Sequence, residues 1–505
     1  MATNKIKFLL NDQLICLTDV DPNLMVLQYL REQQSLIGTK EGCGSGDCGA
    51  CTVVVAELNT DKSNSEKNDL NYKSINACIT FVGNLHGKQL ITVEHLNQTK
   101  PNKTTNQLHP VQQCMVDNHA SQCGFCTPGI VMSCFALHKN NSTPNREEVV
   151  EALAGNLCRC TGYRPIIDAA MQSTSNSSIN KTEDSFTDSY QETIIKLEKI
   201  NNIESLNFEY NDRSYFAPKN TDQLSEHLLS HPHATLFSGG TDLALTVTQN
   251  LDEIADLVYL GNVIELNEIN ESSKEITIGS AVPYSGFKLL LENVYPELGE
   301  MIERIGSAQI RNTGTLGGNI GNASPIGDMP PALIALDARM TLQLGNDIRE
   351  ISVEDYFVGY KQTVLKKSEF IKSIIINKPR PNQILKIYKI SKRFDDDISA
   401  VLVAMSIELG DGLVKKGLVN NIRIAFGGMA EMPKRAKNCE DALSGKKFDQ
   451  ENVDIAKQAL GNDFSPLSDV RASADYRMKV AQNIIQKFYF EIVQEDQLTR
   501  VADHA

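Results

Sequence analysis

The sequence predicts a multidomain protein of mixed helix and strand content, an α+β chain with four modules in series. The length of 505 residues corresponds to three or four domains of ordinary size, and the hydrophobic content of 41% is enough for several cores. Ten of the twelve cysteines lie between Cys43 and Cys160. A Ser/Asn/Thr-rich stretch at 171–188 then separates this cysteine-rich part from a second part that contains two glycine-rich turns.

Charge and hydropathy exclude several classes of protein. The net charge of −14 argues against nucleic acid or an anionic membrane as a partner. No apolar run approaches 18 residues, and Met1 to Leu10 lack the apolar core of a signal peptide. We therefore expect neither a membrane span nor secretion, and hence a cytoplasmic location. A disulfide framework is disfavoured there, so metal ligation explains the concentration of cysteines better.

The first module is predicted to carry an iron–sulfur cluster. Two short strands at 6–10 and 14–17 and a helix at 24–30 precede a glycine-rich loop, and a strand at 52–56 follows it. The loop and a later cysteine give C-x4-C-x2-C spacing plus a fourth thiol; these residues are Cys43, Cys48, Cys51 and Cys78. This is the plant-type 2Fe–2S pattern. Zinc is the alternative, but zinc sites usually contain paired C-x2-C units. Cys16 lies in a strand away from the loop and is interpreted as a core thiol.

A second set of four cysteines falls in a segment of helical character, from about 90 to 171. Its members are Cys123, Cys126, Cys158 and Cys160, with C-x2-C-x31-C-x-C spacing. Two pairs of thiolates suit zinc and a second iron–sulfur cluster about equally. The neighbouring 2Fe–2S loop favours the cluster, because a second carrier extends an electron path that zinc would block. Cys114 and Cys134 are interpreted as core residues.

The second part of the chain has α/β character from about Asn207. Residues 236–242 read L-F-S-G-G-T-D, and residues 314–322 read G-T-L-G-G-N-I-G-N. Neither stretch matches G-x-G-x-x-G and no P-loop pattern is present, so both of those nucleotide-binding folds are disfavoured. Free backbone N–H groups and short hydroxyls in two such turns suit a pyrophosphate.

From about Leu385 the chain is predicted to form a smaller α+β unit. A strand and turn at 422–428 and a long amphipathic helix within 470–492 support this prediction. The loop Ser391–Asp397 is dense in charge. A solvated surface loop and a functional loop are about equally good interpretations of it.

The two cysteine patterns, in this order, resemble the iron–sulfur/flavin subunit of xanthine dehydrogenase, within the molybdenum hydroxylase family. The resemblance covers essentially the whole chain. It implies a β-grasp 2Fe–2S ferredoxin domain at 1–88, a helical 2Fe–2S domain at 89–170 and a linker at 171–205. An α/β FAD-binding domain at 206–384 and an α+β C-terminal flavoprotein domain at 385–505 would follow.

The resemblance also implies roles for individual residues. The first cysteine set would bind an outer cluster and the second an inner one, with Gln122 and Cys160 against the molybdopterin of a partner domain. The implied FAD residues are Leu236, Phe237, Ser238, Gly239, Gly240, Thr241, Asp242, Leu243, Thr315, Leu316, Gly317, Gly318, Asn319, Asp328, Ile371 and Lys389. Ile305 stands where animal relatives place an aromatic residue, and Asn322 stands where they have a hydroxyl. We expect FAD binding to survive both departures.

The same resemblance implies a function. The chain leaves no residues for a molybdopterin domain, so we expect a split enzyme with a molybdopterin-binding large subunit, in a heterodimer or a dimer of heterodimers. Oxidation of hypoxanthine or xanthine to urate would supply electrons that pass through two 2Fe–2S clusters to FAD and then to NAD+. The implied catalytic centre therefore lies on the other chain.

Other functions fit the sequence as alternatives. One is the same subunit in a molybdenum hydroxylase for an aldehyde, an N-heterocycle or carbon monoxide. A stand-alone iron–sulfur flavoprotein and a zinc-stabilised binding module are the others.

Overall fold

The computed structural model of this chain describes residues 2–59, 70–97, 108–174, 184–201, 204–410, 417–493 and 499. They form two compact units. The N-terminal unit comprises Met1–Leu224, His233–Val263 and Gly306–Gly314, and the C-terminal unit comprises Ser225–Pro232, Ile264–Ile305 and Thr315–Ala505. The predicted module boundaries at 88, 170, 205 and 384 stay a prediction, because the two units divide the chain at other positions.

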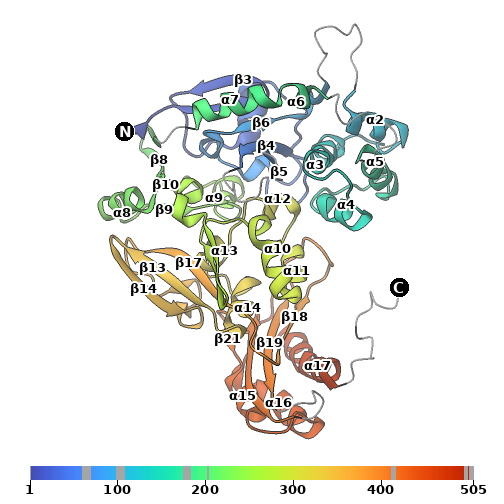
Figure 1. Cartoon of the computed structure of the whole chain (residues 1–505), viewed down its shortest axis with the longest axis vertical. Helices are drawn as coiled ribbons and strands as arrows, with labels where there is room; N and C mark the ends of the chain where they lie inside the picture. Colours follow the sequence, from blue (N-terminus) through green and yellow to red (C-terminus); the bar gives the residue numbers. More distant parts are fainter. Residues whose placement is uncertain are drawn as a thin grey trace. The chain divides into compact units, whose positions relative to one another are not determined.

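A mixed five-stranded sheet forms the start of the N-terminal unit (Figure 1). Its strands are β2 (Ile6–Leu10), β3 (Gln13–Leu17), β4 (Thr52–Leu58), β5 (Leu70–Asn76) and β6 (Gln89–Ile91), in the order β3-β2-β6-β4-β5, and the short helix α1 (Val26–Gln28) follows β3. Strands β2 and β6 are parallel, and the other neighbours are antiparallel. This arrangement agrees with the mixed fold that the sequence predicts for the first module.

The position of Cys16 differs from the prediction. Cys16 is exposed, on β3 at the edge of this sheet. Side chains alternate between the two faces of a strand, and on β3 the neighbours Ile15 and Leu17 pack on the core. The interpretation of Cys16 as a core thiol was therefore wrong.

Four helices follow as one bundle (Figure 1). They are α2 (Pro110–Asp117), α3 (Thr127–Asn140), α4 (Arg146–Leu153) and α5 (Arg164–Thr174). Helix α3 packs against β4 and β5, so Ile130 and Phe135 share one apolar core with Val54 and Leu9 of the sheet. Cys114 and Cys134 also lie in this core, at 0% and 1% exposure, as the sequence analysis predicts.

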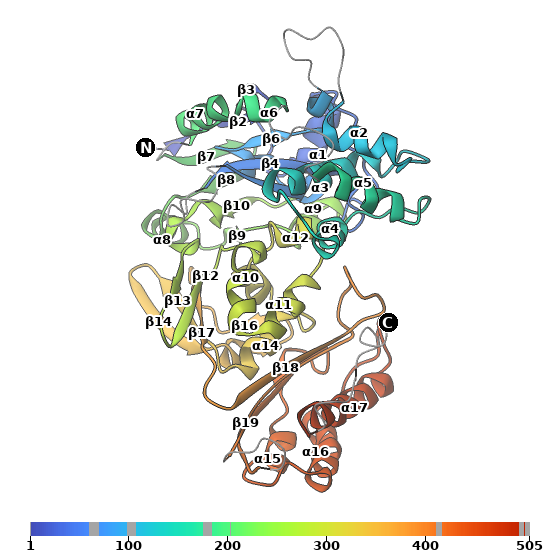
Figure 2. The same ribbon diagram turned by 45° about the vertical axis from the view of Figure 1, so that its right-hand side comes forward.

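The predicted linker at 171–205 contains regular structure. After α5, the described residues form α6 (Ser185–Asp188) and α7 (Tyr190–Ile200), and α7 packs on β2 and β4 (Figure 2). Ile194, Leu197 and Ile200 recur at helical spacing and are buried. This part of the segment is therefore a helical cover for the sheet and not a plain spacer.

A second sheet completes the N-terminal unit. Its strands are β1 (Ala2–Thr3), β7 (Ser205–Tyr210), β8 (Arg213–Ala217), β9 (Thr235–Phe237) and β10 (Asp256–Tyr259), in the order β1-β7-β8-β10-β9. The helices of this region are α8 (Thr221–Ser230), which is divided between the two units, α9 (Ala244–Thr248) and α12 (Ala308–Arg311). Phe237 contacts Phe81 of the first module, with ring centroids 5.2 Å apart, so the two sheets share one apolar core.

The C-terminal unit contains an antiparallel sheet of order β11-β12-β17-β13-β14 (Figure 1). The strands are β11 (Ile269–Glu271), β12 (Glu275–Gly279), β13 (Arg339–Leu344), β14 (Asp347–Ser352) and β17 (Phe370–Asn377), with the small hairpin β15 (Phe357–Gly359) and β16 (Gln362–Thr363). The helices are α10 (Tyr284–Val294), α11 (Pro296–Glu303), α13 (Leu316–Gly321) and α14 (Met329–Ala335). Their apolar faces build the core with Ile276, Ile374 and Met340.

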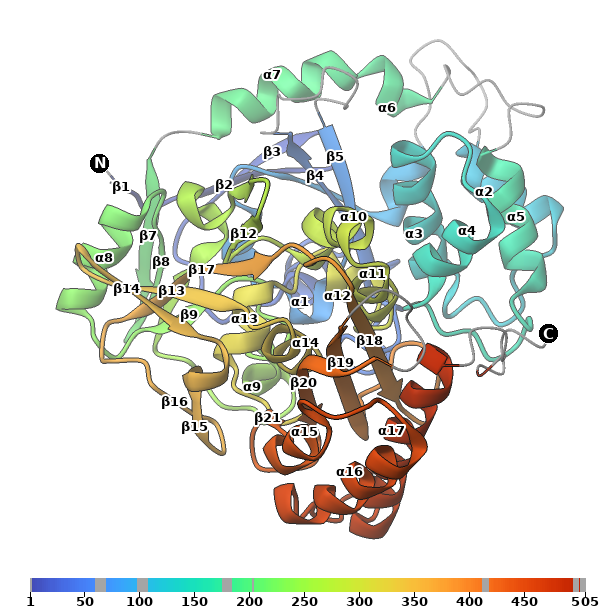
Figure 3. The ribbon, with the colours of Figure 1, turned by 60° about the horizontal axis from the view of Figure 1, so that its bottom comes forward.

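The last module pairs a sheet with three helices, and Figure 3 shows the helices beside its strands. Strands β18 (Gln383–Ile390), β19 (Val401–Leu409), β20 (Val419–Gly427) and β21 (Lys434–Arg435) form an antiparallel sheet in that order. Helices α15 (Lys437–Leu443), α16 (Gln450–Asp463) and α17 (Ala474–Val493) pack beside it. The predicted strand at 422–428 and helix within 470–492 correspond to β20 and α17. Across the described ranges, none of the helices is long and apolar enough to cross a membrane.

Candidate functional site

The outer cysteine loop is a glycine turn between α1 and β4. Gly44, Gly46 and Gly49 have φ values of 68°, 83° and 69°, a conformation that glycine adopts without strain. A side chain at Gly42 would come within 2.8 Å of the Cys48 sulfur. The Ser45 amide donates to the Cys43 sulfur at 3.4 Å, and Asn76 fixes the loop by donating to the Gly46 carbonyl at 2.9 Å. The backbone of this loop therefore lies close to the sulfur atoms of its cysteines.

The four sulfurs of the outer set lie next to one another. Contacts with the Cys48 and Cys78 thiols lower the pKa of Cys43, and contact with Cys78 lowers the pKa of the buried Cys51. Contacts with Cys43 and Cys51, followed by burial, raise the pKa of Cys78. Four crowded sulfurs favour loss of some of their protons, which suits thiolate ligation of iron.

The inner cysteines come from two turns of the helical bundle. The pKa of Cys126 is raised to about 12, first by burial and then by the Cys158 thiol. The Phe125 backbone amide and the Cys160 thiol lower the pKa of Cys123. The structure therefore brings the sulfurs together as two pairs, Cys126 with Cys158 and Cys123 with Cys160. Cys123 and Cys160 are exposed, so this end of the bundle faces solvent.

The two cysteine loops touch through their main chains. The Leu157 amide, one residue before Cys158, donates to the carbonyl of Cys48 at 3.0 Å. A Cβ atom at Gly129 would lie 2.2 Å from the Gly49 carbonyl oxygen, and one at Gly49 would lie 2.2 Å from the Gly155 carbonyl oxygen. Only glycine permits this approach, which joins the predicted sites of the outer and inner clusters.

The first glycine turn of the predicted FAD site ends strand β9. It contains the predicted residues from Leu236 to Leu243, and Gly240 has a φ of 72°. A Cβ atom at Gly239 would lie 2.1 Å from the carbonyl oxygen of Thr313, within the N-terminal unit. Gly239 therefore packs on the main chain of residues 313 and 314 without room for a side chain.

The second glycine turn is the start of α13 in the C-terminal unit. Thr315 caps this short helix by accepting from the Gly318 amide at 3.1 Å, and a Cβ at Gly317 would collide with Ser280 at 2.4 Å. Ile371 on β17 lies beside this turn, 3.6 Å from a Cβ built at Gly321. The structure thus places Ile371 beside the turn that contains the predicted residues Thr315, Leu316, Gly317, Gly318 and Asn319, and their role in FAD binding stays a prediction.

Asp328 and Lys389 form a buried ion pair in the same unit, with Nζ and Oδ2 2.7 Å apart. Lys389 also donates to the Arg304 carbonyl at 2.6 Å, and Ser399 donates to the other oxygen of Asp328 at 2.5 Å. Arg304 in turn donates to the Phe394 carbonyl at 3.1 Å. The charge-dense loop Ser391–Asp397 is therefore anchored through Arg304 to the two predicted flavin residues.

Three buried polar atoms in the C-terminal unit lie beside or within the second glycine turn or near Asp328. The Ser280 hydroxyl, the Tyr284 hydroxyl and the Asn319 Oδ1 atom have no hydrogen-bond partner among the described residues. Burial raises the pKa of Tyr284, and the nearby Asp328 carboxylate raises it further. A buried polar group without a partner costs about 1–3 kcal/mol, so these atoms suit a polar ligand such as FAD.

Sequence reasoning did not find Ser280, Tyr284, Ser399 or Arg304. Each of them is an ordinary residue in its own stretch of sequence. They become candidates only because the fold places them beside Gly317, Asp328 or Lys389. The one local signal is that Ser280 follows the end of strand β12, next to a helix start at Tyr284.

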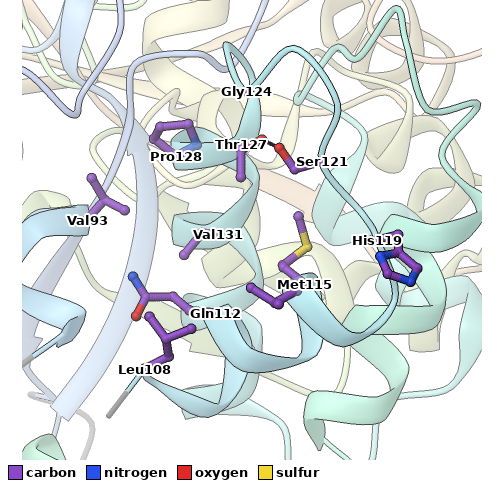
Figure 4. Close-up of a pocket in the computed structure, with 11 residues that line it drawn as sticks. Val93, Leu108, Gln112, Met115, His119, Ser121, Gly124, Thr127, Pro128 and Val131 are labelled. Atoms are coloured by element: carbon purple, nitrogen blue, oxygen red, sulfur yellow. Dashed lines mark hydrogen bonds between the residues drawn. The ribbon is translucent and has the colours of Figure 1, made fainter. Parts of the chain in front are cut away.

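A cavity of about 570 Å³ borders the inner cysteine loop (Figure 4). It is lined by Val93, Leu108, Gln112, Met115, Val116, His119, Ser121, Gly124, Thr127, Pro128 and Val131. Most of these side chains are apolar, and the Ser121 and Thr127 hydroxyls are hydrogen-bonded to each other at 2.7 Å. Ser121 and Gly124 flank Gln122 and Cys123, so the cavity adjoins the exposed end of the bundle.

Among the described residues, one further group of possible metal ligands consists of His109 and His138 of the helical bundle and Asp184, which precedes α6; all three are buried. His109 Nδ1 accepts from the Val111 amide at 3.2 Å, so the neutral ring carries its proton on Nε2, which lies 3.3 Å from Asp184 Oδ2. That ring has no lone pair left for a metal. Lys139 contacts the same carboxylate oxygen at 2.6 Å and would repel a cation. The cluster is an internal ion pair with two neutral histidines.

Sequence models of four protein families match the chain. They are a 2Fe-2S iron-sulfur cluster binding domain at 10–83, a [2Fe-2S] binding domain at 92–171, an FAD binding domain in molybdopterin dehydrogenase at 206–379, and a CO dehydrogenase flavoprotein C-terminal domain at 386–492. The fold and the site thus define an oxidoreductase module with two 2Fe–2S domains and an FAD domain.

Curated proteins that are similar to this chain include xanthine dehydrogenases and an aldehyde oxidase. Xanthine dehydrogenase of Emericella nidulans is 32% identical over 97% of this chain and 39% of that protein, and the enzyme of Drosophila subobscura is 31% identical over the same shares. Aldehyde oxidase 3 of Rattus norvegicus is 27% identical over 98% of the chain and 39% of that protein. The chain therefore spans about two fifths of the length of the curated relatives it matches.

Solved structures of two further oxidoreductases are similar to parts of this chain. A carbon monoxide dehydrogenase from Hydrogenophaga pseudoflava has a TM-score of 0.51 at 26% identity, over 54% of this chain and 94% of that one. Quinoline 2-oxidoreductase from Pseudomonas putida 86 has a TM-score of 0.51 at 26% identity, over 57% and 99%. The chain corresponds to the N-terminal iron–sulfur/FAD part of a molybdenum hydroxylase, and is an electron-transfer module of that family, as its cysteine patterns predict.

Proposed function

We propose that this chain is the electron-transfer subunit of a xanthine dehydrogenase. It would carry electrons from a molybdopterin centre on a partner chain through two 2Fe–2S clusters to FAD and on to NAD+, in the oxidation of hypoxanthine and xanthine to urate. The main-chain contact between Leu157 and Cys48 is the observation that carries this proposal, because it joins two four-thiol sites directly. The similarity to xanthine dehydrogenases over 97% of the chain supports the substrate class.

Each group of residues has a proposed task. The clusters supply one-electron transfer and FAD converts single electrons to a hydride, when these groups are bound. The proposed ligands are Cys43, Cys48, Cys51 and Cys78 for the outer cluster, and Cys123, Cys126, Cys158 and Cys160 for the inner one. Backbone amides lie near sulfurs of both sets, the Ser45 amide at Cys43 and the Phe125 amide at Cys123. Asp328 and Lys389 would neutralise each other's charge inside the proposed flavin site, where both side chains are buried.

The proposed partner is a molybdopterin-binding large subunit, in a heterodimer or a dimer of heterodimers in the cytoplasm. We propose that the large subunit docks on the exposed end of the helical bundle. Cys123, Cys160 and Gln122 are exposed, and the apolar Phe125 and Leu157 are 50% and 46% exposed beside them. The molybdenum site on the partner would select the substrate. The similarity to an aldehyde oxidase and to a quinoline oxidoreductase supports the same subunit role with another substrate as the second candidate.

The test separates the two half-reactions. The purified chain should fail to oxidise xanthine but should pass electrons from NADH to an artificial dye. Addition of the molybdopterin-binding chain should restore urate formation with NAD+. Xanthine oxidation by the chain alone would contradict the two-chain arrangement. Restored oxidation of an aldehyde or quinoline, without xanthine, would favour the second candidate.

A further inference from the structure

Gln309 is a buried glutamine at the contact between the two cysteine loops. It lies on the short helix α12, within the stretch that matches the FAD family model, yet this stretch belongs to the N-terminal unit. Its side chain is 0% exposed. Burial of a flexible amide is costly unless hydrogen bonds compensate for the loss of water, so the partners of Gln309 indicate its role.

The Gln309 amide nitrogen is surrounded by three acceptors. Nε2 lies 3.0 Å from Asn156 Oδ1, 3.1 Å from Thr52 Oγ1 and 3.3 Å from Ser133 Oγ. Thr52 directly follows Cys51, Asn156 precedes Cys158 by two residues, and Ser133 lies on α3 after Cys126. One side chain therefore contacts the segments that carry ligands of both predicted clusters.

The Gly49 carbonyl, which can only accept, determines the orientation of Asn156 and Thr52 in this network. Asn156 Nδ2 donates to it at 3.1 Å, so Asn156 Oδ1 must face Gln309. Thr52 Oγ1 also donates to the Gly49 carbonyl, at 2.6 Å, and is left as an acceptor. Gln309 must then present its Nε2 atom. Its Oε1 atom is turned toward Gly155 and has no hydrogen-bond partner among the described residues.

The next three residues after Gln309, two on α12 and one at its C-terminal cap, contact the same two modules. Ile310 lies 3.4 Å from a Cβ built at Gly46 of the outer loop. Arg311 pairs with Glu151 of α4 at 3.5 Å, and Asn312 donates to the Ser74 carbonyl on β5 at 2.9 Å. Helix α12 therefore holds the first sheet of the N-terminal unit (β2 to β6) and the helical bundle together. Gln309 lies at the centre of this contact.

We propose that Gln309 is a positioning residue for electron transfer between the two clusters. Its amide holds the Cys48–Cys51 turn against the segment before Cys158, and so fixes the separation of the two cluster sites. The inference rests on the proposed function, because it requires a cluster in each cysteine set. Electron tunnelling slows steeply with distance, so a small displacement of either loop lowers the rate.

The test replaces the donor in the complete chain loaded with both clusters. Gln309→Met removes the hydrogen bonds at nearly the same volume. Iron and sulfide content and both EPR signals should remain. The rate of electron exchange between the clusters after rapid photochemical reduction should fall about tenfold or more, as for other residues that support metal ligands. The magnetic interaction between the two reduced clusters should weaken.

Gln343→Met is the matched control. Gln343 is also buried, donates one hydrogen bond to the Gly345 carbonyl at 2.9 Å and leaves its Oε1 atom unpaired among the described residues, but it lies on β13. This variant should keep the exchange rate of the unsubstituted chain. If Gln309→Met does not fold, Thr52→Val tests the same network from the outer loop and should slow the exchange. Full cluster content with an unchanged exchange rate in either test variant would overturn the role of Gln309. A single cluster in the unsubstituted chain would instead overturn the proposed function, and iron analysis distinguishes the two results.

Discussion

Among single residues, the cysteines of the helical bundle divide into ligand candidates and core residues by their surroundings. Cys114 and Cys134 are packed among apolar side chains, and burial raises the pKa of both thiols, to about 12 for Cys134. A neutral buried thiol is a small hydrophobic group and a poor ligand. Cys126 and Cys158 instead lie in turns and contact each other. The sequence pattern and the burial thus lead to the same assignment.

Replacing these cysteines tests the assignment. Cys126→Ser or Cys158→Ser should abolish one of two 2Fe–2S EPR signals, because serine does not replace a thiolate ligand of the cluster. Cys114→Ser and Cys134→Ser are matched controls that should leave both signals, although the buried hydroxyl will lower stability by about 1–3 kcal/mol. Loss of a signal in either control would show that the wrong four residues were assigned.

We expect the histidine–carboxylate cluster to make the stability of the helical bundle depend on pH in the acid range. Burial, followed by the neighbouring His109 and Lys139 side chains, lowers the pKa of His138 to about 4. The unfolded chain takes up this proton near pH 6.5. The free energy of unfolding should therefore fall as the pH decreases from about 6.5 toward 4, by about 1.4 kcal/mol per pH unit for this group.

A histidine variant measures that contribution. His138→Asn should make the free energy of unfolding depend less steeply on pH between 7 and 5, as measured by urea denaturation. His231→Asn, at an exposed histidine, should keep the original slope. The same slope in both variants would show that His138 is not held neutral in the folded bundle.

Among the elements, the contact of α3 with the outer loop depends on glycine at its first turn. Gly129→Ala would place a methyl group 2.2 Å from the Gly49 carbonyl oxygen, so the backbone must shift. We expect a loss of about 1–3 kcal/mol in the free energy of unfolding. Gly461→Ala is the control, because a Cβ at this position in α16 meets nothing within 4 Å. It should be neutral or stabilise by up to about 1 kcal/mol. Chemical denaturation measures the free energy of unfolding of both variants. Equal stability of Gly129→Ala and Gly461→Ala would contradict the prediction.

The strands and cysteine loops of the first module could be predicted because their signals are local. Alternation of apolar residues and fixed cysteine spacing are contained in short stretches of sequence. Helix α7 was missed because the polar residues before it dominated the composition, although Ile194, Leu197 and Ile200 have helical spacing. Cys16 was misassigned because a strand pattern does not reveal which face meets the core.

At the scale of the whole molecule, contacts between distant segments could not be predicted. Gln309 meets Asn156, Ser133 and Thr52 across 153, 176 and 257 positions of sequence. Asp328 and Lys389 were implied by resemblance, but their ion pair was not. Such pairs depend on how modules pack, which residue types and spacing do not determine.

The exposed end of the helical bundle allows a test of the proposed division of labour. Gln122→Arg adds charge and bulk beside Cys123. In the reconstituted pair it should block turnover from xanthine to NAD+ and spare NADH-to-dye activity, because only the end of the path near the partner is disturbed. Gln191→Arg, on the exposed face of α7, should leave both activities unchanged. Equal loss of both activities in Gln122→Arg would mean that Gln122 supports folding.

The late position of α12 in the chain has a consequence for biosynthesis. Thr52, Ser133 and Asn156 are translated well before their common donor, since Gln309 follows Cys160, the last predicted ligand, by roughly 150 residues, or about 7–30 s at typical elongation rates. During that interval the two cysteine-bearing modules can fold, but the polar groups between them lack their donor. In the nascent chain the main-chain contact between the two cysteine loops can therefore form first, and the hydrogen bonds of Gln309 are added only after the flavin-domain stretch has emerged from the ribosome.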